Sequence, residues 1–289
     1  MLFAVVKRFL FRFQVCFYDE MSHKQRLDLL LLMKGLASSR HQAQQLIRAG
    51  KVRDGNGQLL DKPGHEVSQE LELQVEQPPR FVSRGGEKLL GALRAFPLNV
   101  EGRVCLDGGI STGGFTDCLL QHGAARVYGI DVGYGQTAWD LRNDPRVVLR
   151  ERTNLRTLSS DQLYGAEEPL ASLAVADLAF ISLRLVLPAI KKLLKPDHSE
   201  AVLLVKPQFE VGRERVGKGG VVRDALAHVD ALKSVIDASR SLGWWPKGLI
   251  ASPITGPAGN HEYLLWLGDE EETLADLPVL ERLVAQTLA

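Results

Sequence analysis

The stretch that decides the fold is LDGGISTGGF at residues 106–115, followed by GID at residues 129–131. Each segment closes an apolar run with a carboxylate, first Asp107 and then Asp131. A glycine-rich turn follows the first run, and a helical pattern covers residues 115–122. A strand, a glycine turn, a helix and a second strand in this order predict the first half of a nucleotide-type binding site in an open α/β sheet.

The residues of this turn narrow the choice of ligand. Its glycines let the backbone approach a ligand closely, and Asp131 can accept hydrogen bonds from ribose hydroxyls. The glycine spacing is not G-x-G-x-x-G, so a nicotinamide dehydrogenase is the weaker alternative. Asp107 places negative charge where a pyrophosphate would be repelled. S-adenosylmethionine (SAM) carries a sulfonium and an ammonium group, so we expect a SAM-dependent methyltransferase.

The composition is that of an ordinary globular protein. The chain has 289 residues, of which 45% are hydrophobic and 24% charged, and its formal net charge is zero. A nucleic-acid partner would therefore need a local basic patch. The cysteines at positions 16, 105 and 118 form no metal-spaced cluster or disulfide framework, and the seven histidines show no ligand spacing. We therefore predict no metal and a reducing, cytoplasmic location.

The first residues are apolar with interspersed cations, as in MLFAVVKRFLFRF at residues 1–13. This segment lacks the uninterrupted apolar core of a signal peptide and is too short and too charged to span a membrane. We expect residues 1–21 to be a peripheral extension, with no stable membrane association.

From residue 83 onward, apolar runs alternate with helical patterns. Strands are expected at residues 103–107, 126–131, 147–150, 173–177, 201–206 and 263–267, and near residues 246–252. Such runs are typical of a parallel sheet that is covered on both faces. We therefore predict a Rossmann-like α/β domain at residues 83–289 with a mainly parallel seven-stranded sheet, preceded by a linker at residues 78–82.

Residues 22–77 predict a small α+β domain with two helices and short strands. The pattern R-L-D…S-R-x-x-A-x-x-L-I-x-x-G-x-V, from Arg26 to Val52, resembles the S4 RNA-binding domain. That resemblance implies an RNA-binding face made of Arg26, Ser39, Arg40, Gln44, Arg48 and Lys51. The alternative is an ordinary solvated helix with scattered cations.

Several further motifs occur in order. They are VSRGGEKL at residues 82–89, DVGYGQ at 131–136, ADLAFISL at 176–183, VKPQFE at 205–210 and GPAGNHEY at 256–263. Together with the S4 pattern they resemble the TlyA family, in which an S4 domain precedes an FtsJ-like methyltransferase and some members are labelled haemolysins. The resemblance covers residues 22–270. It implies 2'-O-methylation of cytidine ribose in 16S and 23S ribosomal RNA.

The resemblance also implies a catalytic Lys-Asp-Lys-Glu tetrad, which falls on Lys88, Asp177, Lys206 and Glu262. The chemistry agrees, because a ribose hydroxyl is a poor nucleophile and needs a base, which a neutral lysine can provide. Lys206 is the candidate base, Lys88 would raise the local positive potential, and the carboxylates would orient both lysines. They would also stabilise charged lysine, and the sequence does not decide which effect prevails. The alternative is a structural salt-bridge network.

The expected contacts to SAM and RNA complete the site. For SAM they are Asp107, Gly109, Ser111, Thr112, Gly113, Gly114, Phe115, Asp131 and Asn154, although Asn154 fits a helix cap equally well. Arg84 and a glycine-rich basic loop at residues 212–223, with Arg213, Arg215 and Lys218, are further candidates for RNA phosphates. Two competing functions remain open: an S4-type RNA-binding or ribosome-assembly factor without catalysis, and a membrane-active cytolysin.

Overall fold

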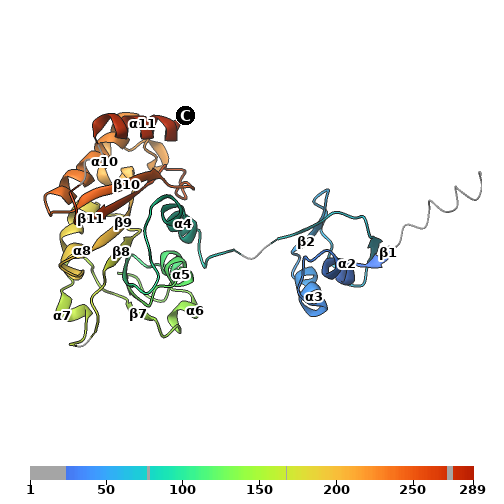
Figure 1. The fold of residues 1–289 in the computed structure, drawn as a ribbon. Coiled ribbons are helices and arrows are strands. Elements are labelled where there is room, and N and C mark those ends of the chain that lie inside the picture. Colours follow the sequence, from blue (N-terminus) through green and yellow to red (C-terminus); the bar gives the residue numbers. More distant parts are fainter. Residues whose placement is uncertain (1–23, 77–78, 167, 272–275) are drawn as a thin grey trace, which may run out of the picture. The chain divides into compact units, whose positions relative to one another are not determined.

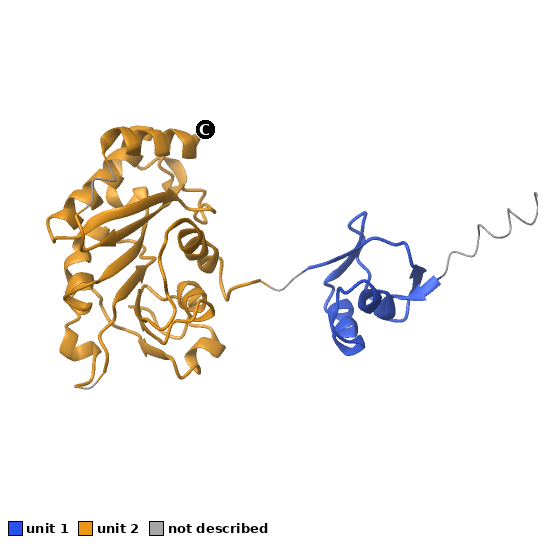
Figure 2. Ribbon diagram, viewed as in Figure 1, with its two compact units in different colours: residues 1–78 blue, residues 79–289 orange. Residues whose placement is uncertain are grey.

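The computed structural model describes residues 24–76, 79–166, 168–271 and 276–289. The chain divides into two compact units, residues Met1–Pro78 (unit 1) and Pro79–Ala289 (unit 2), which are coloured separately in Figure 2. The N-terminal extension expected at residues 1–21 lies outside the described residues.

Unit 1 is a small α+β domain (Figure 1). Its elements are β1 (Lys24–Arg26), α2 (Leu27–Met33), α3 (Arg40–Arg48), β2 (Val52–Asp54), β3 (Glu66–Ser68) and β4 (Leu73–Val75). The pairs β1–β3 and β2–β4 are both antiparallel. Apolar residues of both helices share one core, which includes Leu27, Leu31 and Ile47. Ser39 caps α3 by accepting a hydrogen bond from the backbone N–H of Gln42, as side chains of this type do at helix starts.

Unit 2 is built on a seven-stranded sheet in the order β10-β11-β9-β8-β5-β6-β7. Strands β5 to β9 run parallel, whereas β11 is antiparallel to both β9 and β10. The bounds are β5 (Val104–Gly108), β6 (Arg126–Ile130), β7 (Val147–Arg150), β8 (Leu173–Ala176), β9 (Glu200–Val205), β10 (Trp245–Ala251) and β11 (Tyr263–Gly268). This confirms the predicted mainly parallel sheet and the small α+β domain that precedes it.

Helices cover both faces of this sheet (Figure 1). They are α4 (Gly85–Ala95), α5 (Gly114–Gln121), α6 (Trp139–Arg142), α7 (Ser160–Leu163), α8 (Leu187–Leu193), α9 (Pro207–Glu210), α10 (Ala225–Arg240) and α11 (Leu277–Leu288), with short 3₁₀ turns η1 (Leu183–Leu185), η2 (Arg213–Arg215) and η3 (Lys218–Gly220). Phe81, in the expected linker, belongs to the core of unit 2 and lies where a side chain at Gly86 would have to be.

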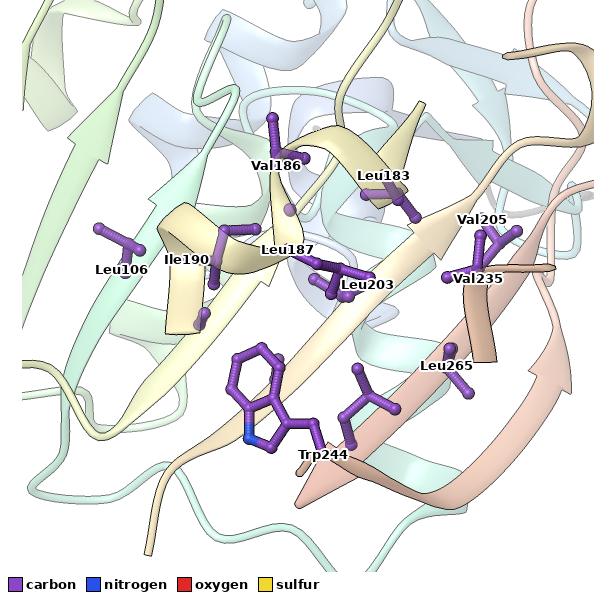
Figure 3. Close-up of a cluster of buried hydrophobic side chains, with 14 of the residues drawn as sticks. Leu106, Leu183, Val186, Leu187, Ile190, Leu203, Val205, Val235, Trp244 and Leu265 are labelled. Atoms are coloured by element: carbon purple, nitrogen blue, oxygen red, sulfur yellow. The ribbon is translucent and has the colours of Figure 1, made fainter. Parts of the chain in front are cut away.

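Successive strand residues point to opposite faces and therefore enter two different cores. In β5, Cys105 packs in the core beneath α4 and α5, whereas Leu106 packs in the core beneath α8 and α10. Figure 3 shows the second core, where Leu106, Leu203 and Leu265 come from three strands and Trp244 fills the space beside them. Trp244 is fully buried, as expected for a packing residue.

The chain order places a ligand crevice at β5 and β8. From β5 the chain adds β6 and β7 on one side, and then returns to add β8 and β9 on the other. Ligands of open α/β sheets bind at such a switch point, beyond the carboxyl ends of the strands. At this point the turn after β5 lies close to the backbone after β8. Gly109 has a φ of 82°, and a Cβ there would lie 2.9 Å from the carbonyl oxygen of Asp177.

Candidate active site

A cavity of about 640 Å³ opens at this switch point. Its volume is in the range of sites for nucleotide-sized ligands. Among the residues expected to contact the cofactor, those that line the cavity are Gly109, Ser111, Thr112, Gly114, Phe115, Asp131 and Asn154. Three members of the expected tetrad, Lys88, Asp177 and Lys206, line the same cavity, as does Arg84. The two expected sites are therefore continuous.

Asp131 directly follows β6 and is held by backbone groups. Its two carboxylate oxygens accept hydrogen bonds from the N–H groups of Ser111 (2.8 Å) and Gly133 (2.7 Å). Each carboxylate oxygen has a further lone pair, so the side chain can still accept hydrogen bonds from a ligand. Its position between the glycine turn and residues 132–136 suits the ribose hydroxyls of an adenosine.

Asp107 lies beneath the turn and does not line the cavity. Its side chain is buried, accepts a hydrogen bond from the Thr116 hydroxyl (2.6 Å), and has no partner for its second oxygen, Oδ1, among the described residues. Burial raises the pKa of this carboxyl to about 7, because a desolvated carboxylate is unfavourable. A cationic ligand above the turn would favour the charged form, so the residue suits the amino-acid end of SAM.

Asn154 and Gly113 are the remaining cofactor candidates, and only Asn154 lines the cavity. Asn154 accepts a hydrogen bond from the Arg156 N–H (3.0 Å), so it caps a turn while it also lines the cavity. Gly113 is the N-cap of α5, with a φ of 102°, and does not line the cavity. The exposed residue Tyr134 stacks on Arg152, whose guanidinium carbon lies 4.3 Å from the ring centre.

The four tetrad candidates form one chain of ion pairs. Lys206 Nζ lies 2.6 Å from Asp177 Oδ1, and Lys88 Nζ lies 3.6 Å from Asp177 Oδ2 and 2.7 Å from Glu262 Oε2. Lys88 and Glu262 are buried, with 7% and 1% of their side chains exposed, whereas 23% of Asp177 is exposed. Asp177 is therefore shared by both lysines, and Glu262 balances Lys88 from below the cavity.

The fold explains why these four residues meet. Asp177 and Lys206 directly follow the neighbouring parallel strands β8 and β9. Tyr263 pairs with Val205 in the antiparallel register of β11 and β9, which brings Glu262 opposite Lys206. Lys88 comes from the first turn of α4. Gly256 leaves room for the cluster, because a Cβ there would lie 2.7 Å from Glu262 Oε1.

Three residues of the expected RNA face of unit 1 are joined by a buried carboxylate that the sequence analysis did not single out. Arg26, Arg40 and Gln44 all donate hydrogen bonds to the buried carboxylate of Asp28. Ser39 is used as a helix cap, Lys51 pairs with Glu76 (2.8 Å), and Arg48 is exposed. The R-L-D pattern contained Asp28, but nothing in its spacing indicated that Arg40 and Gln44 would reach it.

The basic loop at residues 212–223 is tied down near its C-terminal end. Asn260 accepts a hydrogen bond from the Val222 N–H (3.0 Å) and donates one to the Gly220 carbonyl (2.8 Å). Arg215 turns back to pair with Asp224 (2.9 Å) and Asp230 (2.6 Å). Arg213 and Lys218 are exposed. Of the loop cations proposed for phosphates, these two therefore point to solvent, and Arg215 is committed to an intramolecular pair.

Phe180 is a second feature that the sequence analysis did not single out. It lines the cavity, 91% of it is exposed, and its φ of 65° is unusual for a residue with a bulky side chain. Its ring packs against Phe209, with ring centres 5.4 Å apart, and Lys206 Nζ lies 5.9 Å from the centre of the Phe209 ring. The exposed ring of Phe180 and the half-buried ring of Phe209 thus lie near the candidate base.

Among the residues that the structure describes, no group of three His, Cys, Asp or Glu side chains is arranged to hold a metal ion. No helix in those parts of the chain is long and apolar enough to cross a membrane.

Fold and site together define the class of this protein: a Rossmann-like methyltransferase domain preceded by a small RNA-binding type of domain. A family model described as FtsJ-like methyltransferase matches residues 81–269, and one described as S4 domain matches residues 25–73. The chain belongs to the TlyA family of S4 plus FtsJ-like methyltransferases.

Three relatives illustrate the family. The "16S/23S rRNA (cytidine-2'-O)-methyltransferase TlyA" of Mycobacterium tuberculosis is 48% identical over 93% of this chain and 99% of its own. The "Putative rRNA methyltransferase YqxC" of Bacillus subtilis is 50% identical over 87% of this chain and 89% of its own. A solved structure named "Putative hemolysin from Streptococcus thermophilus" is 43% identical, with a TM-score of 0.68, and covers 91% of this chain and 95% of that one.

Proposed function

We propose that this chain transfers a methyl group from SAM to the 2'-hydroxyl of a cytidine in ribosomal RNA, with Lys206 as general base. The observation that carries the proposal is the ion-pair chain Lys206–Asp177–Lys88–Glu262, of which the first three residues line the cofactor-sized cavity. The names of the relatives support the substrate class. A ribosomal substrate also favours a cytoplasmic location.

The geometry suits proton removal by Lys206. When bound, the cofactor supplies an electrophilic methyl group on a positively charged sulfur. A hydroxyl beside Lys206 would donate its proton to Nζ as it attacks, and neutral lysine is the form that can accept it. Asp177 holds Nζ in place at 2.6 Å, and its second oxygen faces Lys88, which offsets part of its negative charge. Glu262 in turn keeps the buried Lys88 fixed.

The aromatic pair at the cavity mouth fits the base of the target nucleotide. A 2'-hydroxyl inside a helix cannot reach a recessed site unless its nucleotide is turned out of the stack. Phe180 is exposed, its ring packs against Phe209, and its φ of 65° is unusual for a bulky residue. We propose that its ring stacks on the displaced cytosine beside Lys206.

The decisive test is methyl transfer to ribosomal subunits purified from cells that lack this gene. Full-length protein should transfer labelled methyl groups from SAM, and mass spectrometry of nuclease digests should find 2'-O-methylcytidine. A product methylated on a base would overturn the ribose assignment. Absence of SAM binding, even with subunits present, would favour the RNA-binding factor. Lysis of red cells by protein that lacks residues 1–20 would favour the cytolysin.

Phe180→Ala should lower the rate of methyl transfer to intact subunits by roughly five- to hundredfold, because base–aromatic stacking contributes about 1–3 kcal/mol. Phe180→Tyr should retain most of the rate, since its ring remains. SAM affinity, measured by calorimetry, should be unchanged in both variants. Equal rates for Phe180→Ala and wild-type protein would remove the stacking assignment while leaving Lys206 as the candidate base.

A further inference from the structure

Asp28 is the point at which three polar side chains of unit 1 converge. Arg26 donates to it twice, from Nε (3.1 Å) and Nη2 (3.0 Å), Arg40 donates from Nε (3.1 Å), and Gln44 donates from Nε2 (2.8 Å). The Asp28 side chain is completely buried. Its backbone N–H is bonded to the carbonyl of Pro63 (3.1 Å). The carboxylate is thus fixed from both its backbone and its side chain.

The two arginines keep part of their donor sets for other partners. Their side chains are 43% and 51% exposed, although each is anchored on Asp28. Arg40 is attached only through Nε, and neither of its terminal nitrogens has a hydrogen-bond partner among the described residues. The guanidinium of Arg26 also lies against the backbone of Gly64, where a Cβ would be 3.2 Å from Nη1. Two outward-facing guanidinium groups are therefore held next to one carboxylate.

We infer that Asp28 is a positioning residue, which aligns Arg26 and Arg40 into one clamp for the phosphates of structured RNA. The inference rests on the proposed function, because it assigns the RNA contact of that function to a prearranged pair. A free arginine loses side-chain entropy when it is fixed, and a prearranged planar fork loses less per hydrogen bond. Phosphate is the ligand that two such forks match best.

The ionic state of Asp28 supports this arrangement. The hydrogen bonds from Arg26, followed by those from Gln44 and Arg40, hold the pKa of this carboxyl well below its usual range despite burial. The cluster therefore keeps a fixed net charge of plus one at physiological pH, from two guanidinium groups and one carboxylate. Gln44 completes the carboxylate's hydrogen bonds without adding charge.

This inference and simple electrostatics predict opposite results for Asp28→Asn. The substitution removes a negative charge, so attraction alone would make the variant bind RNA more tightly. If alignment matters, binding to ribosomal subunits should instead weaken by roughly tenfold, because both arginines lose their common anchor. The matched control is Asp54→Asn, which removes a carboxylate from the same unit. Asp54 is also buried, but it accepts hydrogen bonds only from the backbone of Asn56 and Gln58.

The experiment uses the full-length chain, ribosomal subunits and, as a probe without a fixed shape, a short unstructured single-stranded RNA. Asp28→Asn should weaken subunit binding roughly tenfold with little loss on the single-stranded RNA, and Asp54→Asn should bind both within twofold of wild type. Adding Asp28→Asn to an Arg26→Ala, Arg40→Ala background should change affinity by less than twofold, since nothing is left to align. Thermal unfolding of each variant identifies any that are not folded at the assay temperature.

Subunit binding by Asp28→Asn that equals or exceeds wild type would overturn the inference. So would an equal loss with and without the two arginines, which would make Asp28 purely structural. If Asp28→Asn is unfolded, Arg40→Ala and Arg40→Lys provide the test. Alignment predicts weaker subunit binding for both variants, since a lysine has no planar fork of donors to align. A wild-type chain that binds subunits no better than the single-stranded RNA would instead refute RNA targeting by unit 1, and with it part of the proposed function.

Discussion

The two units each contain a carboxylate that holds two cations, but the cations differ. In unit 2, Asp177 is shared by Lys206 and Lys88, and in unit 1, Asp28 is shared by Arg26 and Arg40. Arginine cannot release its proton in a protein, whereas lysine can act as a base when it is neutral. A carboxylate shared by two cations therefore suits two tasks: proton transfer where the cations are lysines, and phosphate binding where they are arginines.

The largest effect expected from this difference is at Lys206. Lys206→Ala should lower methyl transfer by about 10²- to 10⁴-fold, the usual contribution of a general base. Lys206→Arg should be equally inactive, because it restores the charge beside Asp177 but not the ability to accept a proton. Single-turnover assays at saturating SAM and subunits measure this, with binding of both expected within a few-fold of wild type. Activity in Lys206→Arg would show that the cluster needs only positive charge.

Separating the two clusters tests their division of labour. Protein that lacks residues 1–77 should keep the complete sheet and bind SAM normally, because the core of unit 2 contains no residue of unit 1. Its methylation of subunits at low enzyme concentration should fall by about 10²- to 10⁴-fold, since two charged contacts contribute about 1.5–3 kcal/mol each. The salt dependence of RNA binding should also flatten. Full activity of the truncated protein would shift targeting to Arg213 and Lys218.

What the sequence predicts best is the set of residues that end strands. Asp177 and Lys206 could be placed together because parallel strands share an edge, and Asp131 because it closes the second strand. Contacts set by the packing of helices could not be predicted. The approach of Arg40 to Asp28 depends on the angle between α2 and α3, and the positive φ of Phe180 has no sequence signal. The pairing of Arg215 with Asp224 and Asp230, at the start of α10, has no sequence signal either.

A third carboxylate, Asp131, sharpens the comparison because its hydrogen bonds come from backbone N–H groups and not from cations. Asp131→Ala should weaken SAM binding roughly ten- to hundredfold, since hydrogen bonds to a charged acceptor contribute about 1.5–3 kcal/mol. Asp131→Asn keeps the shape and should fall between wild type and alanine. RNA affinity should not change in either variant. Unchanged SAM affinity by calorimetry would place the ribose elsewhere in the cavity.

The smallest effect concerns Asp107, which is about as buried as Asp28 but forms no ion pair with a cation among the described residues. Its pKa is therefore raised to about 7, where that of Asp28 is lowered. Because the folded chain holds the Asp107 proton more tightly than the unfolded chain, this group makes the ligand-free protein less stable as pH rises from about 4 to 7, with no further change above that.

Binding of a cationic cofactor favours the Asp107 carboxylate and so releases a proton below pH 7. SAM affinity should accordingly rise by up to about tenfold between pH 6 and pH 8 and then level off, since one pH unit below the pKa leaves about a tenth of the group ionised. Asp107→Asn removes this contribution, while the titration of the cofactor's own amine is common to both proteins. Calorimetry at pH 6.5 in two buffers of different ionisation enthalpy counts the protons released. The same pH dependence in both proteins would mean that Asp107 does not sense the cofactor's charge, and that the acid beneath the glycine turn only supports the start of α5 through Thr116.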